Sequence, residues 1–79
     1  MPWMMAIRGE RLTVDLRPRL VGDEWDQLLD AVIAELPNLS RVRLVIPEEY
    51  DTETPRQLLD ALVIILNQRG VDVERRYKG

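Results

Sequence analysis

Two short segments of the sequence alternate between apolar and polar side chains, residues 11–17 strictly and residues 41–46 with the exception of Val45, and this alternation constrains the fold more than any other feature. The positions expected to face the core are Leu12, Val14, Leu16, Val42, Leu44 and Ile46, and the apolar Val45 falls on the outer face. A period of two residues predicts β-strands, each with one face in the core and the other in water. A doubly wound sheet needs strands that are apolar on both faces. The alternation therefore predicts a sheet with helices on one face only.

Two helices are predicted from apolar residues that recur every three or four positions. The first spans residues 23–36, with Asp23 as its N-cap; its apolar residues are Trp25, Leu28, Leu29, Val32 and Leu36. The second spans residues 54–69, because Thr54-Pro55-Arg56-Gln57 matches a capping box with proline at the first helical position. Gly70 is expected to end this helix in a left-handed conformation.

Strands are also expected over residues 3–7 and 71–76, so the predicted order is β-β-α-β-α-β. The fold class is α/β: a single two-layer domain, residues 1–79, with both helices on one face of a four-stranded mixed sheet. Right-handed crossovers give the strand order 1-2-3-4, with the first strand antiparallel at the edge. On the open face, carboxylates and guanidinium groups should pair across strands. They belong to Asp15, Asp72, Glu74, Arg11, Arg41 and Arg43.

The composition excludes several kinds of chemistry. The chain has 79 residues and contains neither cysteine nor histidine, so it has no disulfide, no thiolate metal site and no Ser–His or Cys–His nucleophile. A net charge of −3 argues against non-specific binding to nucleic acid. The apolar segment before Arg8 is too short for a membrane span or for a signal-peptide core with its flanks. We therefore expect a cytoplasmic protein that binds neither nucleic acid nor membranes.

An acidic segment, residues 48–53, precedes the second predicted helix. Its carboxylates lack the spacing of a calcium loop and a glycine for the turn, so a solvated loop is expected rather than a metal site. An enzyme with Glu49 and Asp51 as a carboxylate pair is the weakest hypothesis, because no phosphate-binding loop or nucleophile elbow accompanies them. We therefore predict no enzyme activity, no metal and no cofactor.

Two aliphatic residues of the second predicted helix fall outside its apolar arc. At about 100° per residue, Ile64 lies among polar residues and Val63 lies beside Arg56 and Asn67. The arc itself consists of Leu58, Leu59, Leu62, Ile65 and Leu66. Either the two residues are scattered surface aliphatics, which are common, or the outer face of this helix contacts a partner.

The order and spacing of these elements resemble a minimal STAS domain, the family of bacterial anti-sigma-factor antagonists and of cytoplasmic domains of sulphate transporters. Gly9–Gly22 is similar to the family's second strand and the approach to its first helix, and Val42–Ile46 to its central strand. Asp51-Thr52-Glu53-Thr54 stands where the family has Asp-Ser-Ser-Gly or Asp-Ser-Gly at a helix start. Asn67–Val73 resembles the end of that helix and the next strand. The resemblance spans residues 9–74 and implies a one-faced β-α fold.

The resemblance also implies a mechanism of partner switching. Family members bind an anti-sigma-factor kinase, and phosphorylation of a Ser or Thr at the helix N-terminus releases them. Thr52 matches this phosphoacceptor and Asp51 the acidic residue before it. Glu53 and Thr54 depart from the small residues that follow the phosphoacceptor in the family. A phosphate on Thr52 would also meet repulsion from the neighbouring carboxylates.

We therefore predict a non-enzymatic protein-interaction domain in signalling, with an anti-sigma-factor or kinase-like protein as partner. Its binding surface comprises the loop and helix start at residues 47–57 and continues along the second helix. The candidate contact residues are Glu49, Tyr50, Asp51, Glu53, Val63 and Ile64. The alternative is a small structural subunit without a phospho-switch, whose homodimer covers the open sheet face or the outer face of the second helix. A switch requires that the hydroxyl of Thr52 be exposed.

Overall fold

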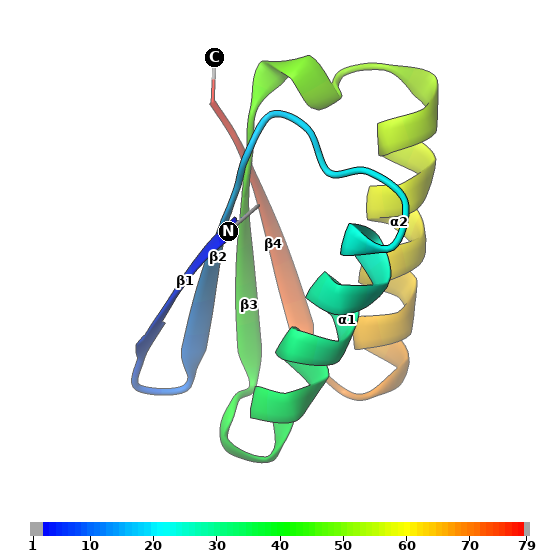
Figure 1. Cartoon of the computed structure of the whole chain (residues 1–79). Helices are drawn as coiled ribbons and strands as arrows, with labels where there is room; N and C mark the ends of the chain where they lie inside the picture. Colours follow the sequence, from blue (N-terminus) through cyan, green and yellow to red (C-terminus); the bar gives the residue numbers. More distant parts are fainter. Residues whose placement is uncertain (1–2, 79) are drawn as a thin grey trace.

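The computed structural model describes residues 3–78 and contains the six predicted elements in the predicted order (Figure 1). The strands are β1 (Trp3–Arg8), β2 (Arg11–Leu16), β3 (Arg41–Ile46) and β4 (Asp72–Tyr77). The helices are α1 (Glu24–Glu35) and α2 (Glu53–Gln68). Two short 3-10 turns complete the chain: η1 (Leu36–Asn38) follows α1, and η2 (Glu48–Tyr50) follows β3.

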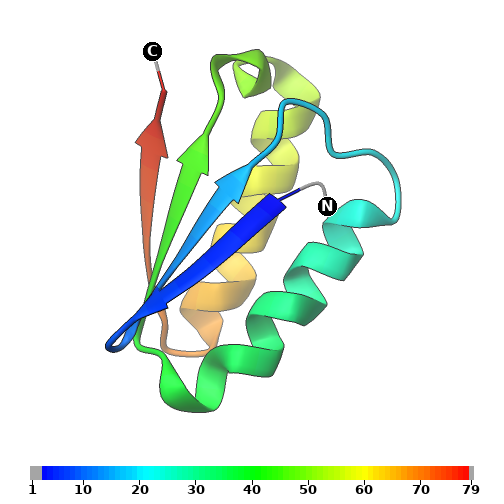
Figure 2. The ribbon, with the colours of Figure 1, turned by 60° about the vertical axis from the view of Figure 1, so that its left-hand side comes forward.

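The four strands form one mixed sheet in the order β1-β2-β3-β4. β1 is antiparallel to β2, whereas β2, β3 and β4 are parallel to one another. Parallel neighbours need a crossover connection, and α1 and α2 supply the two crossovers. Both helices lie on the same face of the sheet, and the opposite face is open (Figure 2). The predicted two-layer α/β fold is therefore confirmed.

The core lies between the sheet and the helices, and it consists of the residues that the alternation placed there. Every second residue of β2 and β3 is buried against α1 and α2. The helices contribute Leu28, Val32, Leu59, Leu62 and Leu66. Trp3, the first residue of β1, also belongs to the core: it is the register partner of Leu16 and is 7% exposed.

The N-terminus of α2 lies two residues earlier than the predicted capping box. Thr52 is the N-cap residue, with an extended backbone (φ −137°, ψ 166°), and its carbonyl accepts the amide of Arg56 at 3.1 Å. Thr54 lies inside the first turn, so the predicted capping box is wrong. Proline fits several positions of a first turn, because the amides there have no intrahelical partner. Pro55 thus indicated a helix start without fixing its first residue.

The C-terminus of α2 has the predicted glycine cap. Gly70 has a φ of +82°, which an L side chain rarely adopts. The amide of Gly70 donates to the carbonyl of Asn67 at 3.0 Å, and the amide of Val71 donates to the carbonyl of Leu66 at 3.1 Å. This pair of bonds is the Schellman motif, and Val71 and Leu66 are both buried, as the motif favours. The cap directs the chain from α2 into β4.

Candidate functional site

The predicted contact residues of the 47–57 segment lie at the carboxyl end of the parallel strands. β3 leads into η2 and then into α2, while β2 leads at the same end into the loop of residues 17–23 (Figure 1). Loops outside this end of an open α/β sheet are a common place for ligands to bind. The site is therefore built from two loops and the helix starts that follow them.

Tyr50 is buried and joins these two loops. Its hydroxyl donates a hydrogen bond to the carbonyl of Arg17, and its ring lies 6.0 Å from that of Trp25, at an angle of 57° between their planes. Burial raises the pKa of Tyr50 to about 12, and the carboxylates of Glu24 and Glu49 act in the same direction. Only 2% of Tyr50 is exposed, so it contributes little surface of its own to which a partner could bind.

The other predicted residues of this segment are exposed. Glu49, Asp51 and Glu53 all lie on the surface, and Asp51 forms an ion pair with Arg56. Thr52 is exposed too, and its side chain makes no capping hydrogen bond to α2, so its hydroxyl is accessible. Within residues 3–78, no three acidic side chains are grouped so that they could hold a metal ion. The segment forms a solvated acidic surface with the accessible hydroxyl of Thr52 at a helix start.

The two aliphatic residues of α2 have different environments. Ile64 is 55% exposed, as its position outside the apolar arc predicted. Val63 is half-buried and packs against the core, so its predicted place on the outer face is wrong. α2 packs against β4, and Asp60, three residues before Val63, forms an ion pair with Arg75 of β4 at 2.8 Å. The buried arc is correspondingly displaced, and Leu58 on its other flank is exposed.

A shallow apolar groove, which we call the helix groove, runs between α1 and α2. Part of it is a hollow of about 100 Å³, with Leu62 among its lining residues. The other lining residues include Trp25, Leu29, Leu58, Ala61 and Ile65. A second hollow of about 360 Å³ shares Trp25 and Leu58 with the first and extends to Val21, which is 64% exposed. The helix groove therefore continues to the loops at the carboxyl end of the sheet.

Sequence reasoning missed the helix groove because it assigned most of these residues to the core. The helical period places Trp25, Leu29, Leu58 and Ile65 on apolar arcs, yet none of them is buried. The available signal was the width of the arcs, since a helix that packs on a sheet buries only a central stripe. The flanks of the two arcs thus form the walls of the groove.

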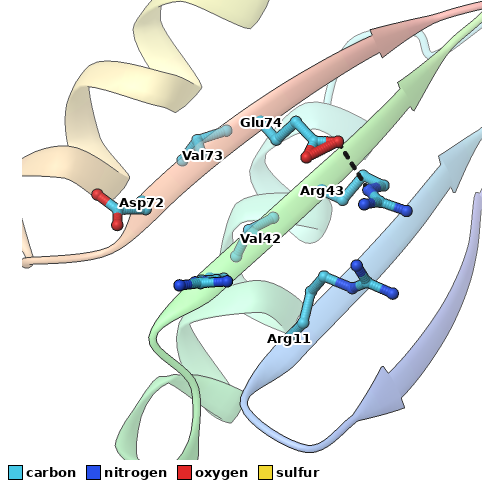
Figure 3. Close-up of a pocket in the computed structure, with 7 residues that line it drawn as sticks. Arg11, Val42, Arg43, Asp72, Val73 and Glu74 are labelled. Atoms are coloured by element: carbon cyan, nitrogen blue, oxygen red, sulfur yellow. Dashed lines mark ion pairs between the residues drawn. The ribbon is translucent and has the colours of Figure 1, made fainter.

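The open face of the sheet carries a charged hollow of about 290 Å³ over β2, β3 and β4 (Figure 3). Nε of Arg43 lies 2.8 Å from Oε1 of Glu74, which confirms one predicted cross-strand pair. Nζ of Lys78 lies 3.1 Å from Oδ1 of Asp15, a pair that was not predicted. The predicted pairs of Arg11 and Arg41 with carboxylates do not form within the described part of the chain. This face is accordingly less neutralised than expected.

No family model matches the chain, and comparisons with curated proteins and with solved structures found no match either. Nothing in them identifies a STAS domain, so that resemblance stays a prediction. In residues 3–78, no helix combines the length and apolar character needed to cross a membrane.

Proposed function

We propose that this chain is a non-enzymatic protein-interaction domain whose helix groove holds a segment of a partner protein. The observation that carries the proposal is the groove itself. Trp25, Leu58 and Ile65 present apolar surface between two helices, next to loops that carry an accessible hydroxyl and several carboxylates. Apolar grooves between helices are a recurrent docking site for amphipathic helices.

Charge indicates which kind of segment fits. Asp26 lines the smaller hollow, and Glu49 and Arg19 line the larger one. α1 contains four acidic residues and no basic one: Glu24, Asp26, Asp30 and Glu35. Complementary charge steers encounter and selects partners. The proposed occupant is therefore an amphipathic helix with apolar residues on one face and lysine or arginine beside them.

The same surface accommodates the switch that the resemblance suggests. Thr52 is the N-cap residue of α2, two residues before Thr54, which lines the larger hollow of the groove. A phosphate at this position is favoured by the helix dipole and opposed by nearby carboxylates. We propose that phosphorylation of Thr52 alters binding of an anti-sigma-factor or kinase-like partner in the cytoplasm. Catalysis by Glu49 and Asp51 is disfavoured, because both are exposed and Asp51 is paired with Arg56.

Peptide binding tests the groove. The probes are a fluorescent amphipathic peptide of leucine and lysine, about 15 residues long so that it can form a helix, and its leucine–glutamate counterpart. Fluorescence anisotropy should show that the chain binds the cationic peptide and not the anionic one. Ala61→Arg places a cation in the groove and should weaken binding about tenfold, equivalent to about 1.4 kcal/mol.

Asn67→Arg is the matched control, because it adds the same charge to an exposed position of α2 outside the groove. It should leave the affinity within about twofold of wild type, which is less than about 0.5 kcal/mol. Equal losses in the two variants would show that only overall charge matters, and failure of the wild type to bind the cationic peptide would reject the groove as its site.

The alternative function, a self-associating structural subunit, is favoured by a different observation. β1 is an edge strand without a charged residue from Trp3 to Ile7, and its Met4 and Ile7 are 66% and 52% exposed. The other edge strand, β4, carries charges that discourage strand addition. Antiparallel pairing of two β1 strands about a two-fold axis would give a closed homodimer.

Sedimentation of three proteins separates the possible self-contacts. Ile7→Lys places a charge on the β1 edge, and Ile64→Glu places one on the exposed face of α2. Loss of a dimer in Ile7→Lys alone would assign the contact to β1, and loss in Ile64→Glu alone would assign it to α2. Circular dichroism confirms that each variant is folded. A wild type that stays monomeric at high concentration would reject the subunit hypothesis.

A further inference from the structure

Three arginines stand side by side on the open face of the sheet. Arg8 of β1 is the register partner of Arg11 of β2, and Arg11 is the register partner of Arg41 of β3. Register partners project from the same face, and Arg11 and Arg41 each precede a core residue of their strand, so all three project away from the helices. We call Arg8, Arg11 and Arg41 the arginine row.

No ion pair neutralises the arginine row within residues 3–78, although Asp72 of β4 is the register partner of Arg41. The ion pairs of that part of the chain engage Arg43, Arg56, Arg75 and Lys78, and no carboxylate lies within ion-pair distance of the row. The nearest turn residue, Glu10, instead accepts a hydrogen bond from the hydroxyl of Ser40 at 3.1 Å. Like charges directly opposite one another in a sheet are destabilising. The row therefore holds three cations together at a cost in stability.

Two further observations indicate a place for a ligand. Arg8, Glu10, Arg11 and Arg41 line a hollow of about 360 Å³ at the end of the sheet beside the β1–β2 turn. It shares Arg11 and Arg41 with the charged hollow of about 290 Å³ shown in Figure 3. Nε of Arg11 is a buried atom that has no hydrogen-bond partner among the described residues. A donor already removed from water is available to an acceptor that enters the hollow.

The neutral residues of the open face indicate which kind of anion could bind there. They are Met4, Ala6, Thr13 and Val45, so no aromatic ring of β1, β2 or β3 lies there on which a base could stack. Proteins that bind single-stranded nucleic acid combine cations with such rings. A compact anion therefore fits the hollow better than a nucleic-acid strand.

We propose that the arginine row binds a phosphate group, with its oxygens held by guanidinium groups of adjacent strands. Guanidinium matches two oxygens of a phosphate at once, and such charge-assisted bonds are stronger than neutral ones. The group is inorganic phosphate or the terminal phosphate of a small monoester. This site lies at the opposite end of the sheet from the mouth of the helix groove, so it does not depend on the function proposed above.

Thermal unfolding at constant ionic strength gives the first test. A ligand that binds only the folded state raises Tm, so phosphate should raise that of wild type. Arg11→Gln relieves like-charge repulsion and should have a higher Tm than wild type in chloride, with a smaller further rise in phosphate than wild type shows. Arg76→Gln removes a cation from the same face at a distance from the row, and should keep the wild-type response. Equal rises in all three proteins would overturn the proposal, because they would reflect exclusion of phosphate from the surface.

NMR of the arginine Nε–H groups gives the second test and separates the two sources of phosphate. Titration with inorganic phosphate and with O-phosphoserine should shift the Nε–H signal of Arg11 in wild type, and the tighter of the two identifies the preferred source. The dissociation constant should rise about tenfold in Arg11→Gln, where binding is followed through the Nε–H signals of the remaining arginines. It should stay within about twofold of wild type in Arg76→Gln, so the two variants should differ by about 1 kcal/mol in binding free energy. Shifts of the same size with sulfate, or equal weakening in both variants, would refute a site built for phosphate.

Discussion

Replacement of Tyr50 by phenylalanine should lower the stability of the fold at neutral pH. The change removes only the hydroxyl, so the ring keeps its packing against Trp25. The hydrogen bond to the carbonyl of Arg17 is lost. The expected loss is about 0.5–1.5 kcal/mol, the net contribution of an ordinary intramolecular hydrogen bond.

The same replacement should also change how stability depends on pH. Burial raises the pKa of Tyr50 from 10.0 to about 12, so the folded chain favours the neutral phenol. The stability that this preference contributes is complete below about pH 10 and is lost as the pH rises toward about 12. A difference of about two pKa units corresponds to about 2–3 kcal/mol in total, roughly half of which is lost by about pH 11.

Urea unfolding, followed by tryptophan fluorescence from about pH 7 to about pH 12, measures both effects. Other titrating groups act on both proteins alike, so the quantity to compare is the difference in their free energies of unfolding. Wild type should be the more stable at pH 7, and the order should reverse above about pH 11. Tyr77→Phe, which removes an exposed phenol, is the control and should keep the wild-type profile. A difference that stays constant across this range would refute the burial of the Tyr50 hydroxyl.

Three further predictions concern α2 and its ends. Leu62→Ala should cost about 2–5 kcal/mol, because Leu62 is 4% exposed on the buried stripe of α2; a urea midpoint like that of wild type would contradict this. Gly70→Ala should cost about 1–2 kcal/mol, because the φ of +82° is strained for alanine; thermal unfolding measures it, and an unchanged Tm would count against the glycine cap. Thr52→Ala and Thr54→Ala should each change stability by less than about 0.5 kcal/mol, because neither hydroxyl caps α2; a loss above about 1 kcal/mol at Thr54 alone would restore the capping box.

The fold could be predicted because a strand that buries only one face alternates between apolar and polar residues. Leu12, Val14 and Leu16 are all buried, and the polar residues between them lie on the open face. The glycine cap could also be predicted, since a positive φ strongly favours glycine. The first residue of α2 could not be predicted, because Pro55 is compatible with several positions of a first turn.

The candidate site was less predictable because it depends on which elements are neighbours. Tyr50 follows two exposed glutamates and has the sequence context of a loop residue, but η2 places its ring against Trp25. Likewise, the helical period locates Leu58 and Ile65 on α2 without showing how α1 lies beside them. The arginine row also depends on register: alternation places Arg11 and Arg41 on one face, whereas only the antiparallel pairing of β1 brings Arg8 alongside.

The antiparallel orientation of β1 has a consequence for how this domain can be rearranged or joined to others. Trp3 is paired with Leu16, and Tyr77 is paired with Ile46. The start of β1 and the end of β4 therefore lie at the same end of the sheet, on its two opposite edges. Three interstrand spacings of about 4.8 Å separate them by roughly 14 Å, which about five extended residues can span. A circular permutant could therefore be closed by a short linker across this end and opened at Gly9, where the β1–β2 turn is exposed. Every strand pairing would be retained, and the arginine row would then lie beside the new ends of the chain.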